Sequence, residues 1–112
     1  MTESNPAFCP YYHHAIELIG RRWTGAILRE LLHGTARFSE LRSAVPGLSD
    51  RLLSERLKEL EAEKVVQRRV IPASPVRIEY VLTPKGRDLE SVVNSLSEWA
   101  EAWVKPGLAR AV

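Results

Sequence analysis

Apolar residues recur at helical spacing in several separate stretches of the chain, and residues that start or stop helices bound each stretch. A first helix is predicted to start at Pro10, because proline suits the first helical position, and to end at Gly20. A second helix is predicted to begin at Trp23 or Thr24 and to close at Gly34. Both are expected to form a shelf for the elements that follow.

The middle of the chain predicts two helices separated by a very short turn. Ser39–Val45 reads as a two-turn helix capped by Ser39, with Phe38 in a short extended piece before it. After a Pro-Gly-Leu turn, Ser49–Ala62 reads as a longer helix capped by Ser49. Its apolar stripe consists of Leu53, Leu57 and Leu60, widened by Leu52. Two helices joined in this way form a helix-turn-helix, whose second helix reads DNA, although the stretch alone also fits an ordinary amphipathic helix.

After Ala62 the hydrophobic period changes from helical to two. Residues 65–71 are rich in β-branched side chains, and two prolines within 72–75 stop any strand there. Residues 76–83 then alternate apolar and polar side chains, as a half-buried strand does. A β-hairpin is therefore predicted directly after the reading helix. The fold class is mainly α with a small β-hairpin, a winged helix-turn-helix.

A last helix is predicted from Thr83-Pro84 to about residue 105, with a frayed tail after Pro106. Its apolar seam consists of Leu89, Val92, Leu96, Trp99 and Trp103, broadened by Val93. The spacing is that of a short coiled coil, although packing on its own domain is the alternative. The leucines of the earlier helices are enough to fill much of the small core of such a chain. We therefore expect this seam to face a second subunit, together with Tyr12 and Ile16 of the first helix. The expected dimerisation segments are about 8–20 and 84–105.

Composition narrows the class of protein. With 112 residues, 45% of them hydrophobic, the chain suits one domain over 1–112, and a dimer interface would add burial to its small core. The single cysteine excludes an intramolecular disulfide and favours a cytoplasmic protein. No export signal and no membrane-length apolar stretch are recognised. A net charge of +2 is only mildly basic, so any nucleic-acid surface must come from the local placement of cations.

The polar side of the predicted reading helix supplies the candidates for base contacts. Arginine and lysine can pair with guanine, and serine with either base type or a phosphate. Glu55 could accept a hydrogen bond from cytosine N4 or orient Arg51 four residues before it by an ion pair. The second role is expected, because a carboxylate near the phosphates is repelled. Arg56 is expected to face a phosphate or to pack its stem. The candidates are Ser49, Arg51, Ser54, Glu55 and Lys58.

Cations also concentrate where the wing would meet a phosphate backbone. The segment from residue 64 to residue 78 contains no acidic residue, although the whole chain is nearly balanced in charge. Surface strands often carry arginine, but the missing acids favour contact with nucleic acid. Ser39 and Arg42, at the start of the preceding helix, suit phosphate contacts as well. The candidates on the wing are Arg68, Arg69 and Arg77.

Cys9 is the one residue with potential redox chemistry. A thiol at a helix N-terminus gains from the helix dipole, which stabilises the thiolate, and His13 lies one turn further on. A small, inert, half-buried cysteine is the alternative. Together with the histidines it forms no closed set of ligands at a known zinc spacing, so no metal and no cofactor are expected. No nucleophile motif, phosphate loop or paired carboxylates are recognised, so no enzyme activity is expected.

Several motifs in fixed order extend over roughly residues 8–105. They are Cys9-Pro10, Ile19–Thr24 (IGRRWT), Ile27–Leu31 (ILREL), Arg37–Leu41 (RFSEL), Leu53–Leu60 (LSERLKEL), Val76–Thr83 (VRIEYVLT) and the tryptophan-bearing last helix. In these motifs the chain resembles HxlR-type bacterial transcription regulators. The likeness is specific, because winged helices in general share only the architecture.

The resemblance implies a homodimer, related to MarR-like regulators, that binds pseudo-palindromic operator DNA as repressor or activator. It also suggests an oxidant or electrophile sensor, because some members use a cysteine at the position of Cys9. The pair His13-His14 departs from the family pattern and leaves open which signal the first helix senses. The identity of any small-molecule effector is also left open. A winged-helix module that docks protein rather than DNA is the alternative, but such a module would expose apolar or acidic residues where this chain carries arginines.

Overall fold

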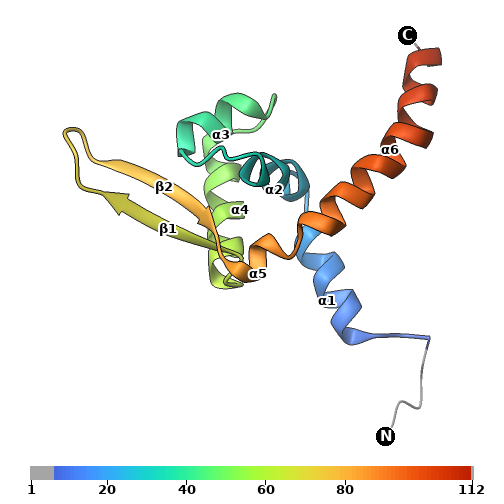
Figure 1. Cartoon of the computed structure of the whole chain (residues 1–112), viewed down its shortest axis with the longest axis horizontal. Helices are drawn as coiled ribbons and strands as arrows, with labels where there is room; N and C mark the ends of the chain where they lie inside the picture. The colour runs from blue at the N-terminus through green and yellow to red at the C-terminus, as the bar shows by residue number, and fades with distance from the viewer. Residues whose placement is uncertain (1–6, 112) are drawn as a thin grey trace, which may run out of the picture.

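The computed structural model describes residues 7–111, so residues 1–6 and Val112 of the expected 1–112 domain lie outside it. The described chain consists of helices and one β-hairpin (Figure 1). In chain order the elements are α1 (Pro10–Ile19), α2 (Thr24–Leu32), α3 (Phe38–Ala44), α4 (Asp50–Ala62), β1 (Val66–Ile71), β2 (Arg77–Leu82), α5 (Pro84–Arg87) and α6 (Glu90–Ala111). The predicted fold class is confirmed.

The core lies between α2, α3, α4 and the base of the hairpin. Leu53, Leu57 and Leu60 of α4 are at most 1% exposed and belong to one cluster with the buried residues of α2 and α3. Ser49 caps α4, since its hydroxyl accepts a hydrogen bond from the Leu52 amide at 3.1 Å. The predicted apolar stripe and N-cap of this helix are therefore confirmed.

The helix-turn-helix differs from its prediction at one end. The cap of α3 is Arg37, not Ser39, and Phe38 is the first helical residue rather than part of an extended piece. The Glu40 carboxylate accepts a hydrogen bond from the Arg37 amide at 3.3 Å, which satisfies that donor without a hydroxyl cap. Arginine has no acceptor, so only this half of a capping box forms. Ser39 is left exposed in the first turn of α3.

Trp23 fixes the turn of the helix-turn-helix against the start of α2. Gly47 has φ +87°, and a Cβ at this position would lie 3.2 Å from the Trp23 ring. Glycine therefore permits both the left-handed backbone and the close approach. Trp23 itself has φ 80° and precedes Thr24, which confirms the predicted start of α2.

The two strands form the predicted antiparallel wing. Val66 lies opposite Leu82 at its base, and Ile71 lies opposite Arg77 at the tip. The Tyr80 amide donates a hydrogen bond to the Ala36 carbonyl at 2.8 Å, so the segment before α3 adds a short edge to the hairpin. The predicted half-burial holds for the whole of β2, in which every residue is buried or half-buried. Val76, which was expected to begin the strand, lies just before β2 and is 60% exposed.

The C-terminal region is the second place where prediction and structure differ. Thr83 caps a helix as expected, but this helix, α5, has only four residues, and α6 begins after a break at 88–89. Gly86 allows α5 to lie directly on the Val65 carbonyl, where a Cβ would collide. The expectation of a frayed tail after Pro106 is wrong, because α6 continues through this proline to Ala111. Loss of one backbone donor therefore does not end the helix.

Candidate nucleic-acid interface

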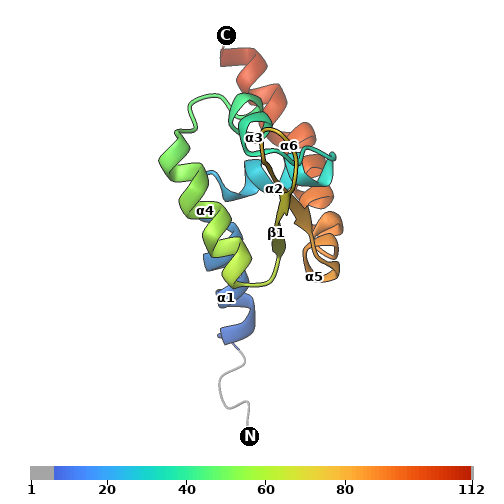
Figure 2. The same ribbon diagram turned by 90° about the vertical axis from the view of Figure 1, so that its left-hand side faces the viewer.

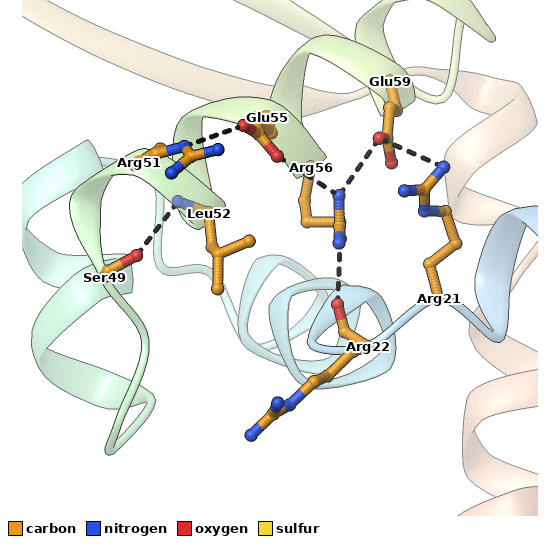
Figure 3. A network of polar contacts seen from close by, with 8 residues as sticks. All are labelled: Arg21, Arg22, Ser49, Arg51, Leu52, Glu55, Arg56 and Glu59. Carbon is orange, nitrogen blue, oxygen red and sulfur yellow. Dashed lines mark hydrogen bonds and ion pairs between the residues drawn. The ribbon is translucent and has the colours of Figure 1, made fainter.

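The exposed edge of α4 carries the side chains that were predicted to read bases. Arg51, Glu55 and Lys58 are exposed, Ser54 is half-buried, and the leucine stripe occupies the opposite side. The Arg51 Nε donates a hydrogen bond to the Glu55 carboxylate at 3.2 Å, so the expected orienting pair is present (Figure 3). The Arg51 side chain remains 87% exposed, and its other donors point to solvent. This edge can therefore donate hydrogen bonds to a groove.

Two predicted phosphate contacts lie around α3. The Arg42 Nε is 3.3 Å from the Asp50 carboxylate, which ties the end of α3 to the start of α4. Arg42 is thus partly neutralised within the chain, although half of its side chain is exposed. Ser39 faces a groove of about 480 Å³ between α3 and the wing tip, which Arg37 and Arg77 also line. Arg37 was not among the predicted contacts, because nothing in the sequence places residues before α3 beside the hairpin.

The arginines of the wing are not equivalent. Arg68 and Arg69 are exposed and make no ion pair with the described residues. Arg77 is half-buried, and its Nε lies 3.1 Å from the Glu79 carboxylate in an ion pair without hydrogen-bond geometry. Since Arg68 and Arg69 are successive strand residues, they point to opposite faces of the hairpin. The wing therefore offers free positive charge on both faces.

Arg56 was expected either to face a phosphate or to pack its stem. Its side chain is internal, so the packing role is correct. Only 9% of its side chain is exposed. Its Nε donates to the Arg22 carbonyl at 2.9 Å, and its Nη1 donates to Glu59 at 3.1 Å (Figure 3). The Glu59 carboxylate also pairs with Arg21 at 3.4 Å. The network links α4 to the segment between α1 and α2.

A contact between α1 and the end of α4 was not predicted. The His14 Nε2 lies 2.6 Å from the carboxylate of Glu63, the C-cap residue of α4. The hydrogen bond from His14 lowers the pKa of Glu63, the charges of His14 and Lys85 act in the same direction, and desolvation opposes them. The Lys85 ammonium donates to the Glu63 carbonyl at 2.7 Å. The sequence contains the pair His13-His14, but it does not show that a partner of His14 lies 49 residues further along the chain.

The apolar residues assigned to a dimer interface lie on the other side of the molecule, where α1 and α6 diverge (Figure 1). None of the residues of α1 is buried, and Tyr12 is 69% exposed. On α6 the outward residues are Val92, Leu96, Trp99 and Trp103. Val93 of α6 and Leu89, in the break before it, pack instead on the chain's own core. An apolar hollow of about 360 Å³ lies between α1, α2 and α6. All described side chains from 101 to 108 are exposed.

Cys9 is the N-cap of α1, as predicted from Pro10. It is exposed rather than half-buried, and its Sγ accepts a hydrogen bond from the Tyr12 amide at 3.4 Å.

Within residues 7–111 no group of three or more His, Cys, Asp or Glu side chains is arranged to hold a metal ion. None of the described helices is long and apolar enough to cross a membrane.

Comparison with known proteins places this arrangement in a family. Residues 18–107 match the model of the HxlR-like helix-turn-helix family. The chain is 51% identical over 98 residues to the HTH-type transcriptional regulator YvaP of Bacillus subtilis, which covers 88% of this chain and 91% of that protein. The reduced form of the transcriptional regulator YodB from B. subtilis superposes with a TM-score of 0.77 at 40% identity, over 88% of this chain and 97% of that one. A structure described as a MarR-family regulator from Enterococcus faecalis gives a TM-score of 0.75 at 30% identity, over 96% and 99% of the two chains. The chain therefore belongs to the HxlR-like helix-turn-helix family of transcriptional regulators.

Proposed function

We propose that this regulator is a homodimer that binds a pseudo-palindromic operator in double-stranded DNA. The observation that carries the proposal is the joint exposure of the α4 edge and of Arg68 and Arg69, which make no ion pair with the described residues. In Figure 2, α4 and the hairpin lie toward the viewer and α6 lies behind them. In a winged helix-turn-helix the second helix enters the major groove and positive charge on flanking elements holds the phosphates.

The proposed contacts divide into two kinds. Arg51 and Lys58 read base edges, helped by Ser49 and Ser54, while Glu55 fixes the direction of the Arg51 guanidinium. Phosphate contacts come from Ser39, Arg42, Arg68, Arg69 and Arg77. Among these, Arg68 and Arg69 contribute most, because Arg42 and Arg77 are already paired with carboxylates and would have to share their charge.

The proposed dimer is built from α1 and α6. The radius of gyration is 16.5 Å, whereas a compact chain of this length has about 13 Å. Three parts of the chain leave the body of the domain: the wing on one side, and α1 and α6 on the other (Figure 1). Of these, α1 and α6 carry most of the large exposed apolar side chains. Apolar patches of this kind are typical of interfaces between subunits. Two-fold symmetry would then place the two copies of α4 roughly 34 Å apart, or a multiple of that distance, matching half-sites about 10 bp apart.

Binding to DNA from upstream of the regulator's own gene tests this function. We expect affinity to fall steeply as salt rises, because bound phosphates release counterions. Footprinting should give two protected half-sites related by a two-fold axis. Absence of salt-sensitive binding, together with capture of a protein by α4, would favour the interaction module instead.

We further propose that Cys9 senses oxidants or electrophiles. The thiol is exposed at the N-cap of α1, and structures of the related YodB are described as diamide-treated and quinone-bound. With no second cysteine in the chain, the thiol can form a mixed disulfide with a small thiol, an adduct, or a bridge to Cys9 of a second subunit. The bridge requires the two Cα atoms to lie within about 7 Å.

The test compares operator affinity of wild type and Cys9→Ser before diamide, after diamide and after reductant. We expect wild type alone to change its affinity and to recover on reduction. Equal responses of the two proteins would leave Cys9 without a sensing role.

A further inference from the structure

Arg56 is an unusual residue for the buried side of a reading helix. Among the residues whose exposure is described, it is the one charged residue in the buried class. It lies on α4 between Leu53 and Leu57, beside the leucine stripe rather than on the exposed edge. Successive residues of an α-helix are about 100° apart, so Arg56 points roughly 140° away from Arg51 and roughly 160° away from Lys58.

Two donors of Arg56 are directed at fixed acceptors. The Nε donates to the main-chain carbonyl of Arg22 at 2.9 Å, and the Nη1 donates to the Glu59 carboxylate at 3.1 Å. Glu59 is held in turn by Arg21 at 3.4 Å, and the carboxylate of Glu55 lies 3.9 Å from the same Nη1. Figure 3 shows the guanidinium between the α4 carboxylates and the Arg22 carbonyl. The contact to Arg22 involves the main chain, so it fixes α4 against the backbone that connects α1 to α2.

Stability alone does not account for such a residue. Removing a charge from water is costly, and a well-packed apolar side chain of similar volume is often as stabilising or more so. An arginine can fix the orientation of the helix, because the strength of a hydrogen bond depends on angle and distance. Apolar burial has no such directional dependence. The leucine stripe keeps α4 against the core, and the planar guanidinium determines how the helix is turned on that core.

We propose that Arg56 is a positioning residue for DNA reading, which sets the rotation of α4 relative to the segment between α1 and α2. A rotation of about 20° moves an atom on the surface of a helix about 10–12 Å wide by roughly 2 Å. That shift exceeds the range of lengths that a hydrogen bond tolerates, so Arg51 and Lys58 would miss their base edges. Arg22 follows α1, which belongs to the proposed dimer contact. The hydrogen bond from Arg56 to the Arg22 carbonyl would therefore also fix the orientation of each α4 relative to the dimer interface. The inference rests on the proposed DNA binding.

The main variant is Arg56→Met, which keeps a long apolar stem and removes every donor. We expect the ratio of operator affinity to non-specific DNA affinity to fall about tenfold, the loss that corresponds to one misplaced bidentate base contact. Non-specific affinity and its salt dependence should stay as in wild type, because the exposed cations are unchanged. Arg56→Lys should not restore the ratio, since one ammonium cannot reach both acceptors in the same geometry. Should Arg56→Met fail to fold, Glu59→Gln takes its place, with an expected loss of about threefold.

The matched control is Leu60→Val, which trims the same buried side of α4 without touching the polar link. It should lower the melting temperature and leave the affinity ratio within about twofold of wild type. A folded Arg56→Met protein that keeps the wild-type ratio would overturn the proposal. So would a Leu60→Val protein whose ratio falls as far as that of Arg56→Met, because a general loosening of the core would then explain both.

A measurement without DNA separates this inference from the proposed function. Residual dipolar couplings of the α4 amides, relative to those of α2, report how α4 is turned on the domain. We expect the couplings of Leu60→Val to fit the wild-type orientation and those of Arg56→Met to depart from it. Unchanged couplings in Arg56→Met would overturn the positioning role even if DNA binds. Changed couplings in a protein that binds no DNA would show that Arg56 sets the rotation of α4, but they would refute the proposed function and with it any role of that rotation in DNA reading.

Discussion

The helices α4 and α6 carry nearly the same apolar spacing but have opposite surroundings. The stripe of α4, with Leu53, Leu57 and Leu60, is almost fully buried in its own domain. The seam of α6 leaves Leu96 65% exposed and Trp103 72% exposed. Helical periodicity therefore indicates that a face needs a partner, but it does not indicate whether the partner lies in the same chain. The polar side of α4 also carries exposed cations, Arg51 and Lys58, in addition to the exposed arginines Arg68 and Arg69 of the wing.

The largest expected effect is a difference in the free energy of unfolding between a variant of the α4 stripe and a variant of the α6 seam. Leu57→Ala should lower the free energy of unfolding by about 2–5 kcal/mol, because it removes a fully buried side chain and leaves a cavity. The matched change Leu96→Ala should lower the unfolding free energy of the isolated chain by less than about 0.5 kcal/mol, since Leu96 is exposed there. Urea unfolding at low protein concentration measures both. Similar losses in the two variants would mean that α6 packs on its own domain.

The second effect concerns the seam of α6 as an interface. Trp99→Asp combined with Trp103→Asp should give a folded monomer, because charges replace large apolar side chains at the proposed contact. Removal of all residues after Lys85 should leave a monomeric or poorly folded chain. Sedimentation at micromolar concentration, with circular dichroism to check folding, decides the outcome. A wild-type protein that sediments as a stable monomer would rule out the dimer.

The third effect contrasts the reading edge with the wing. Arg51→Ala should relax the preference at one base pair, at a cost of about 1–3 kcal/mol. Arg69→Ala should weaken binding to all sequences alike and reduce the salt slope by about 1, as the loss of one phosphate contact does. Affinities for operator and scrambled DNA at several salt concentrations separate the two. A sequence-dependent loss in Arg69→Ala would assign base reading to the wing.

The smallest effect lies at the far end of α4. His14 lowers the pKa of Glu63, so this pair stabilises the fold above the ordinary pKa of a glutamate, and the stabilisation is lost as pH falls through the lowered value. His14→Ala should therefore raise the pKa of Glu63 toward its ordinary range. The control is His13→Ala, whose ring lies against Phe8 rather than Glu63. Carboxyl chemical shifts followed against pH measure the change, and identical curves for wild type and His14→Ala would contradict it.

Much of the fold could be predicted from the chain alone. Pro10, Ser49 and Thr83 stand at helix starts because their chemistry satisfies local donors, and local chemistry is visible in sequence. The change of period after Ala62 and the prolines of the tip specified the hairpin in the same way. The errors fall where a local signal competes with another. Ser39 is a good cap by type, but the cap lies two residues earlier at Arg37, whose amide donates to the Glu40 carboxylate.

The sequence by itself determined which faces are apolar, where the helices start and where cations collect, because each of these depends on residues near one another along the chain. Only the tertiary structure decided that Arg42 is paired with Asp50, that Arg56 turns inward to the Arg22 carbonyl, and that α6 leaves Leu96, Trp99 and Trp103 uncovered. These outcomes depend on which atoms of separate segments meet once the chain has folded. A stretch of sequence specifies what a side chain needs, and the packing of distant segments determines what it meets.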